Sequence, residues 1–175
     1  PDTRDYLRWL DTQNGMITSI WTNARGSYRT ESFAAYDGEV IVNRLSAPEG
    51  QLDVDVTITP PGRPFKHGNM VFKNPFVKSS HELTIEGGMM TLAWAYNPDF
   101  GHKGFVAAIR LLPEGGTMEK IEKGFSVKGA TRLMVVSKIV KFESNFTFAC
   151  KKDVLDELVA IQVDFDKLLK GNEKH

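Results

Sequence analysis

Residues Gln51–Thr59 read QLDVDVTIT, and this stretch has the most regular strand pattern in the chain. Apolar and polar residues alternate along it, so its apolar side chains all point to one face of an extended strand. Such alternation is typical of an antiparallel sheet with one buried face and one solvated face. We therefore expect Asp53 and Asp55 to face solvent, and we expect the apolar set to face a core. This set is Leu52, Val54, Val56 and Ile58.

Similar segments follow one another along most of the chain. The turns between them carry pairs such as Asn14-Gly15 and Asp37-Gly38, which are strong hairpin signals. Strands that recur at a spacing of roughly 8–12 residues with turn signals between them indicate a sandwich. We predict an all-β fold, a large antiparallel β-sandwich. The other expected strands cover residues 6–10, 16–22, 27–35, 40–45, 82–85, 89–96, 105–112, 118–122, 124–128 and 131–139.

The end of the chain changes to helical spacing. We predict one C-terminal helix from Asp153 to Lys170, with Asp153 as its N-cap and Gly171 as its stop. Its apolar stripe would either dock on the sheet or mediate self-association between two molecules, because large exposed apolar patches are uncommon on soluble monomers. The stripe is Leu158, Ile161, Phe165 and Leu168. We divide the chain into a β-sandwich domain, residues 1–150, and a helix that begins a linker, residues 151–175.

The composition narrows the possible partners. The chain has 175 residues, with 22 Lys plus Arg and 22 Asp plus Glu, so its formal net charge is zero. Binding to nucleic acid or to an acidic membrane surface would need a basic excess, and no apolar run approaches the roughly 20 residues that cross a bilayer. We expect neither partner. Cys150 is the single cysteine, which excludes an internal disulfide, and we expect it to be a half-buried structural residue.

No motif in the sequence predicts a catalytic, metal or cofactor site. Metal-binding histidines recur at i and i+4 on a helix or at i and i+2 on a strand, and neither spacing occurs here. A glycosidase needs two carboxylates on either side of the bond that it cleaves, whereas Asp53 and Asp55 point the same way from one strand. We therefore expect no catalytic residue, no metal and no cofactor. The histidines are His67, His81, His102 and His175.

Two aromatic residues form a candidate carbohydrate site. Trp94 and Tyr96 are two positions apart on an expected strand, so they share a face. Sugars stack their apolar C–H faces on exposed aromatic rings, and such a pair would provide a platform for them. The alternative, which we favour for most of the aromatic residues, is that these rings fill the sandwich core.

Five segments resemble one carbohydrate-active family. They are YLRWLDTQNGMITSIWT (6–22), GSYRTESFAAYDGEVIVNRLSAPEGQLDVDVTIT (26–59), GMMTLAWAYNP (88–98), GFVAAIRLLPEGG (104–116) and FSVKGATRLMVVSKIVKF (125–142). Together they look like the N-terminal β-sandwich domain of glycoside hydrolase family 95. The chain departs from the family in lacking its opening LPLGNGRLG-like and LNEDTLWSG-like stretches.

The resemblance implies a non-catalytic scaffold domain. In family 95 the catalytic acid and the residues that activate water lie on a helical barrel that follows the sandwich, so no residue here inherits a catalytic role. The implied parent enzyme hydrolyses terminal α-L-fucosyl or α-L-galactosyl linkages, and the implied partner is its catalytic helical barrel in cis. The implied setting is a secreted or periplasmic bacterial protein. Two alternatives stay open: a stand-alone carbohydrate-binding module, and a structural interaction domain without sugar affinity.

Overall fold

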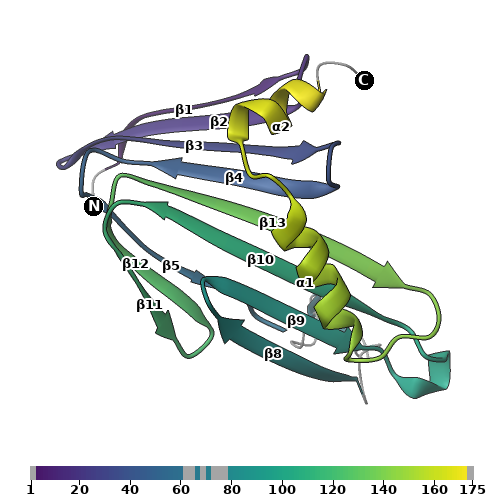
Figure 1. Ribbon diagram of the computed structural model, residues 1–175. Coiled ribbons are helices and arrows are strands. Elements are labelled where there is room, and N and C mark those ends of the chain that lie inside the picture. Colours follow the sequence, from purple (N-terminus) through teal and green to yellow (C-terminus); the bar gives the residue numbers. More distant parts are fainter. Residues whose placement is uncertain (1–2, 61–65, 68–69, 72–78, 173–175) are drawn as a thin grey trace.

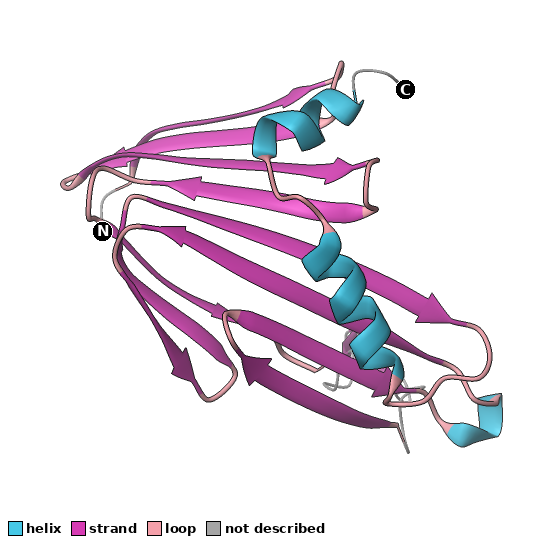
Figure 2. Ribbon diagram, viewed as in Figure 1, coloured by secondary structure: helices cyan, strands magenta, loops and turns pink. Residues whose placement is uncertain are grey.

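The computed structural model describes residues 3–60, 66–67, 70–71 and 79–172. Two antiparallel sheets face each other, and two helices cover part of the outer face of the larger sheet (Figures 1 and 2). The all-β prediction is therefore confirmed. Most of residues 61–80 and His175 lie outside the described residues, as does the side chain of His67.

The larger sheet has eight strands in the order β1-β2-β3-β4-β13-β10-β9-β8. The bounds of these strands are β1 Arg4–Asp11, β2 Met16–Asn23, β3 Gly26–Ala35, β4 Val40–Ser46, β13 Arg132–Phe142, β10 Gly104–Glu114, β9 Met89–Ala95 and β8 Ser80–Glu86. The smaller sheet has the order β11-β12-β5, with β11 Thr117–Ile121, β12 Gly124–Ala130 and β5 Leu52–Thr57. A short hairpin, β6 Lys66–His67 and β7 Met70–Val71, and the 3-10 helix η1 Pro98–Phe100 complete the strand region.

The predicted turns lie where the sequence placed them. Asn14-Gly15 joins β1 to β2, and Gly15 has a φ of 72°, which glycine adopts without strain. Asp37-Gly38 joins β3 to β4. The central pairing of β4 with β13 joins distant parts of the chain, with Val42 opposite Val136. Such a long-range pairing sets the order of the strands and has no local signal.

The core between the two sheets contains the apolar face of β5. Leu52 and Ile58 are buried, and Val54 and Val56 are partly buried against the same cluster, which also contains Phe125. Asp53 and Asp55 are exposed. The predicted orientation of residues 51–59 is therefore confirmed.

The second core lies between the larger sheet and the two helices, α1 Cys150–Ala160 and α2 Phe165–Asn172. Helix α1 packs on β10, β9 and β13, and α2 packs on β3 (Figure 1). Within the predicted stripe, Leu158, Phe165 and Leu168 are buried, and Ile161 is partly buried. The stripe thus docks on the sheet, while self-association through the helix stays a prediction.

The prediction of one continuous helix is wrong. Helix α1 begins at Cys150, so Asp153 lies in its first turn and is not the N-cap. The chain leaves helical geometry at Ile161, which has a ψ of 123° and packs against Gly38 in the β3–β4 turn. The backbone N–H of Lys167 donates to the carboxylate of Asp164 at 3.1 Å, which caps α2, and Gly171 lies inside that helix. The break lets each helix follow a different part of the twisted sheet.

The end of α2 is held by one side chain. The Asn172 amide nitrogen donates to the carbonyl of Ala34 at 2.8 Å and to that of Asn14 at 3.1 Å. Its oxygen accepts from the backbone N–H of Tyr36 at 2.9 Å. Three segments far apart in the sequence therefore meet at Asn172, which extends α2 past the predicted stop.

Candidate functional site

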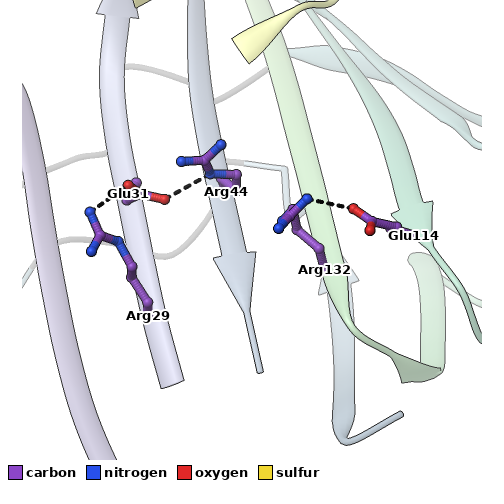
Figure 3. A network of polar contacts seen from close by, with 5 residues as sticks. All are labelled: Arg29, Glu31, Arg44, Glu114 and Arg132. Carbon is purple, nitrogen blue, oxygen red and sulfur yellow. Dashed lines mark hydrogen bonds and ion pairs between the residues drawn. The ribbon is translucent and has the colours of Figure 1, made fainter. Parts of the chain in front are cut away.

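A buried ion-pair network lies on the helix-covered face of the larger sheet (Figure 3). Glu31 on β3 accepts from Arg29 Nη2 and from Arg44 Nε, each at 2.7 Å. The side chain of Glu31 is only 4% exposed. Both arginines belong to strands that the fold places beside each other, since Glu31 lies opposite Arg44 in the β3–β4 pairing. A buried carboxylate is tolerated here because each of its oxygens has a charged donor.

The two arginines control the ionisation of Glu31. Burial by itself raises the pKa of the Glu31 carboxyl. The hydrogen bonds and the positive charges of Arg44 and Arg29 together outweigh burial and hold this pKa below its ordinary value of 4.5. Glu31 is therefore ionised at neutral pH and is fully engaged with its partners, which makes it unsuited to donate a proton in catalysis.

Arg44 connects this network to α2. The Cζ atom of Arg44 lies 3.4 Å from the centroid of the Phe165 ring, a close cation–π contact. Phe165 also packs edge-on against Phe33, with the ring centroids 5.2 Å apart. Glu31 thus orients the Arg44 guanidinium that contacts the ring of Phe165, the first residue of α2.

A second arginine–glutamate pair on the same face is solvent-exposed (Figure 3). Arg132 Nη1 lies 2.6 Å from Glu114 Oε2, across the β10–β13 pairing. The side chain of Glu114 is 61% exposed. Arg29, Ser46, Arg132 and Glu114 occupy one row across four strands. This row is polar, whereas the opposite end of the same face, under the helices, is apolar.

A pocket of about 300 Å³ opens at the polar end of this face. It lies where the β2–β3 turn meets the beginning of β1. Its lining residues include one acidic residue, one basic residue, and three residues with aliphatic hydroxyls. Trp21 and Tyr28 also line it, but their side chains point to the other face of the sheet from those of Ile20 and Arg29. The lining residues are Asp5, Ile20, Trp21, Thr22, Ser27, Tyr28, Arg29, Ser46 and Ala47. No sequence motif marked this site, because its members come from four strands.

The aromatic pair predicted to bind carbohydrate lies elsewhere. Trp94 is only 4% exposed, and its ring stacks between His81, at 5.1 Å, and Phe105, at 6.4 Å. Tyr96 is partly buried, with its ring 6.2 Å from that of Phe105. Both rings therefore pack against neighbouring residues of the larger sheet. A sugar contact by Trp94 and Tyr96 stays a prediction.

The other polar candidates lie apart from one another. Asp53 accepts a hydrogen bond from the Gly129 N–H at 2.9 Å on the exposed side of the smaller sheet. His102 is exposed, and His81 is engaged with Trp94. Cys150 is partly buried at the start of α1. Among the described residues no three His, Cys, Asp or Glu side chains converge as metal ligands.

The helices also bear on membrane association. Neither α1 nor α2 combines the length and the apolar character that a helix needs to cross a bilayer, and no other described helix does.

Comparisons with known proteins agree with the architecture. A family model described as "Glycosyl hydrolase family 65, N-terminal domain" matches residues 1–147. A search of curated proteins finds no match. Among solved structures, a putative kojibiose phosphorylase from human microbiome superposes with a TM-score of 0.65 at 11% sequence identity. The match covers 97% of this chain and 22% of that chain, so the chain spans about a fifth of that protein's length.

Proposed function

Because the chain belongs to the family of glycosyl hydrolase family 65 N-terminal domains, we propose that it is a non-catalytic scaffold that braces the catalytic domain of its parent enzyme. The family description names an N-terminal domain of a glycosyl hydrolase, and we place the catalytic domain after it. In the described part of the chain, the buried carboxylate of Glu31 is held by two arginines, and Asp53 and Asp55 are on an outer strand face. None of these three carboxylates faces another across a pocket in the way that glycoside hydrolysis requires.

The exposed edge strand β1 is the observation that carries the scaffold role. Four of its eight residues are large apolar side chains with exposed fractions between 39% and 60%: Tyr6, Leu7, Trp9 and Leu10. Strand β1 is also one of the two edges of the eight-stranded sheet, with β8 at the other. Native proteins seldom leave a long apolar edge open to water. The catalytic domain of the same protein is the partner that we assign to this edge.

A finer proposal concerns the parent enzyme. The sequence segments resemble glycoside hydrolase family 95, but the family model that matches the chain is that of family 65, so the family 95 assignment is not shown. Action on terminal α-L-fucosyl or α-L-galactosyl linkages, in a secreted or periplasmic bacterial protein, stays a proposal. The kojibiose phosphorylase likeness, at 11% identity, bears on the fold alone. A glycoside phosphorylase is the other candidate for the parent, and the name of that structural neighbour suggests it.

The isolated chain should have no catalytic activity. It is assayed with an aryl α-L-fucoside for hydrolysis and with kojibiose plus inorganic phosphate for phosphorolysis. Neither substrate should turn over, because Glu31 is held by two arginines and because Asp53 and Asp55 point the same way from one strand. Turnover that is abolished by Asp53→Asn or Asp55→Asn would refute the non-catalytic assignment.

The scaffold role is tested by association. The chain and the proposed catalytic domain of the same protein are expressed as separate proteins, and their affinity is measured by isothermal titration calorimetry. Leu7→Lys and Trp9→Lys should each weaken association at least about tenfold, because each replaces an apolar contact in the interface by a charged side chain. Ile139→Lys is the control, because Ile139 is at least as exposed as Leu7 and Trp9 but lies on β13. The assignment of β1 fails if all three variants bind alike, or if Ile139→Lys alone weakens binding.

A further inference from the structure

We propose that Asn145, in the loop between β13 and α1, is an acceptor site for an N-linked glycan. It begins the tripeptide Asn145-Phe146-Thr147, which has the N-x-S/T pattern, without proline at the middle position, that marks such sites. Of the eight asparagines in the chain, only Asn145 is followed two positions later by serine or threonine. The inference rests on the secreted setting proposed above, because these glycans are carried by secreted proteins.

The loop exposes both residues that the pattern requires. Asn145 and Thr147 are exposed, whereas Phe146 between them is only 6% exposed. The Phe146 ring packs against the rings of Phe142 and Phe148, with 5.7 Å between centroids in each case. The buried ring anchors the loop on the fold, while the residues on either side of it stay in water. An N-linked glycan needs this kind of surface loop, since it is bulky and hydrated.

The fold makes no use of the side chain of Asn145. Among the described asparagines, the others each engage a side-chain oxygen or nitrogen in a hydrogen bond. They are Asn14, Asn23, Asn43, Asn97 and Asn172. The amide of Asn145 has no hydrogen-bond partner within the described part of the chain. A glycan on its Nδ2 atom therefore replaces no contact of the folded protein.

The backbone accounts for an asparagine here but not for the whole pattern. Asn145 has a φ of 56°, a left-handed conformation in which asparagine and aspartate are enriched among residues other than glycine. This turn would be served equally well by aspartate. It also places no demand on Thr147, whose hydroxyl makes only a 3.8 Å contact with Cys150 Sγ. A conformational role and an acceptor role therefore differ in what they require at the two positions.

The transfer needs a saccharide donor of the polyprenyl pyrophosphate class. A bond forms between Asn145 Nδ2 and the anomeric carbon of the saccharide, and the bond from that carbon to the phosphate oxygen breaks. The polyprenyl pyrophosphate leaves with the electron pair of the broken bond, and an amide proton passes to a base of the transferase.

The site is compatible with the scaffold role. Strand β13, which ends at Phe142 before the loop, is separated from β1 by three strands in the larger sheet (Figure 1). A glycan that extends from the loop into solvent therefore leaves the apolar edge at β1 free for the catalytic domain. Enzymatic removal of the glycan should leave the affinity for that domain unchanged.

The test is secretion of the chain from a eukaryotic host, followed by peptide mass spectrometry. A second N-x-T tripeptide in a flexible C-terminal tag reports that the transferase has acted. We expect a glycan on the peptide that contains Asn145, and digestion with a peptide N-glycosidase should release it and leave aspartate at this position. A glycan on the tag but none on Asn145 overturns the proposal. Because the host supplies both compartment and transferase, this result is independent of the natural setting of the chain, so the two proposals fail separately.

Three variants separate the acceptor role from the turn. Asn145→Asp keeps a residue that tolerates positive φ but lacks the acceptor nitrogen, and Thr147→Ala lacks the hydroxyl. Each should abolish the glycan without changing the Tm measured by circular dichroism. Thr147→Ser keeps the pattern and should retain the glycan. Persistence of the glycan in Asn145→Asp, or equal glycosylation of Thr147→Ala and Thr147→Ser, would refute the site.

Discussion

Replacement of Glu31 by Gln probes the network that joins the sheet to α2. Removing one partner of a buried ion pair typically costs about 3–5 kcal/mol, because a charge is left without its counterion. Here the stranded charges are partly hydrated, since Arg29 is 45% exposed and Arg44 23% exposed. Gln also keeps one oxygen acceptor. We therefore expect the free energy of unfolding to fall by about 2–3 kcal/mol.

The assay is thermal unfolding followed by circular dichroism at pH 7. For a chain of this length, a loss of this size corresponds to a fall in Tm of roughly 5–10 °C. Amide hydrogen exchange should accelerate in α2, because Glu31 orients the Arg44 guanidinium that lies 3.4 Å above the Phe165 ring. Glu114→Gln is the control, since its pair with Arg132 is exposed and should contribute less than about 1 kcal/mol.

The pH dependence gives a second test of the same network. The pKa of Glu31 is lowered in the folded chain, so its ionised form stabilises the fold above the ordinary pKa of 4.5. This contribution is lost as the pH falls through the lower pKa of the folded state. The difference in Tm between the parent chain and Glu31→Gln should be constant from about pH 6 to 8 and should narrow below about pH 4.5. Equal stability of the two chains at pH 7, or a difference that does not change with pH, would refute the reasoning.

Two further substitutions test the packing of the helices and of the smaller sheet. Phe165→Asp should lower the free energy of unfolding by at least about 3 kcal/mol in urea titrations, because it removes a buried ring and places a charge beside Phe33. The control is Val159→Asp, on the exposed side of α1, which should change this free energy little. Equal effects of the two substitutions would contradict the docking of α2 on the sheet. Gly124→Ala would place a Cβ 1.9 Å from the Val56 carbonyl oxygen. It should therefore accelerate hydrogen exchange along β5 relative to Ser126→Ala, and unchanged exchange would show that the two strands are not so closely paired.

Several features of the fold follow from patterns that are local in the sequence. The alternation in residues 51–59 predicts which side chains of β5 are buried, because neighbouring side chains of any extended strand point to opposite faces. The turn at Asn14-Gly15 is predicted for a similar reason, since glycine adopts positive φ at no steric cost. The helical spacing near the end of the chain also predicts that Leu158 and Phe165 are buried. The prediction of one continuous helix overlooked one signal in the sequence. Asp164, directly before Phe165, is a good N-cap residue and indicates that a second helix begins there.

Other features depend on segments that meet only in three dimensions. The sequence alone determined that this is an all-β chain with an apolar helical tail and without a recognisable catalytic motif. Only the tertiary structure decided that β4 pairs with β13, that Trp94 is buried between the rings of His81 and Phe105, and that Glu31 is buried between two arginines. It also assembled the pocket from four strands. The physical reason is that backbone propensity acts between near neighbours along the chain, whereas burial, ion pairing and pocket shape depend on which distant strands lie side by side.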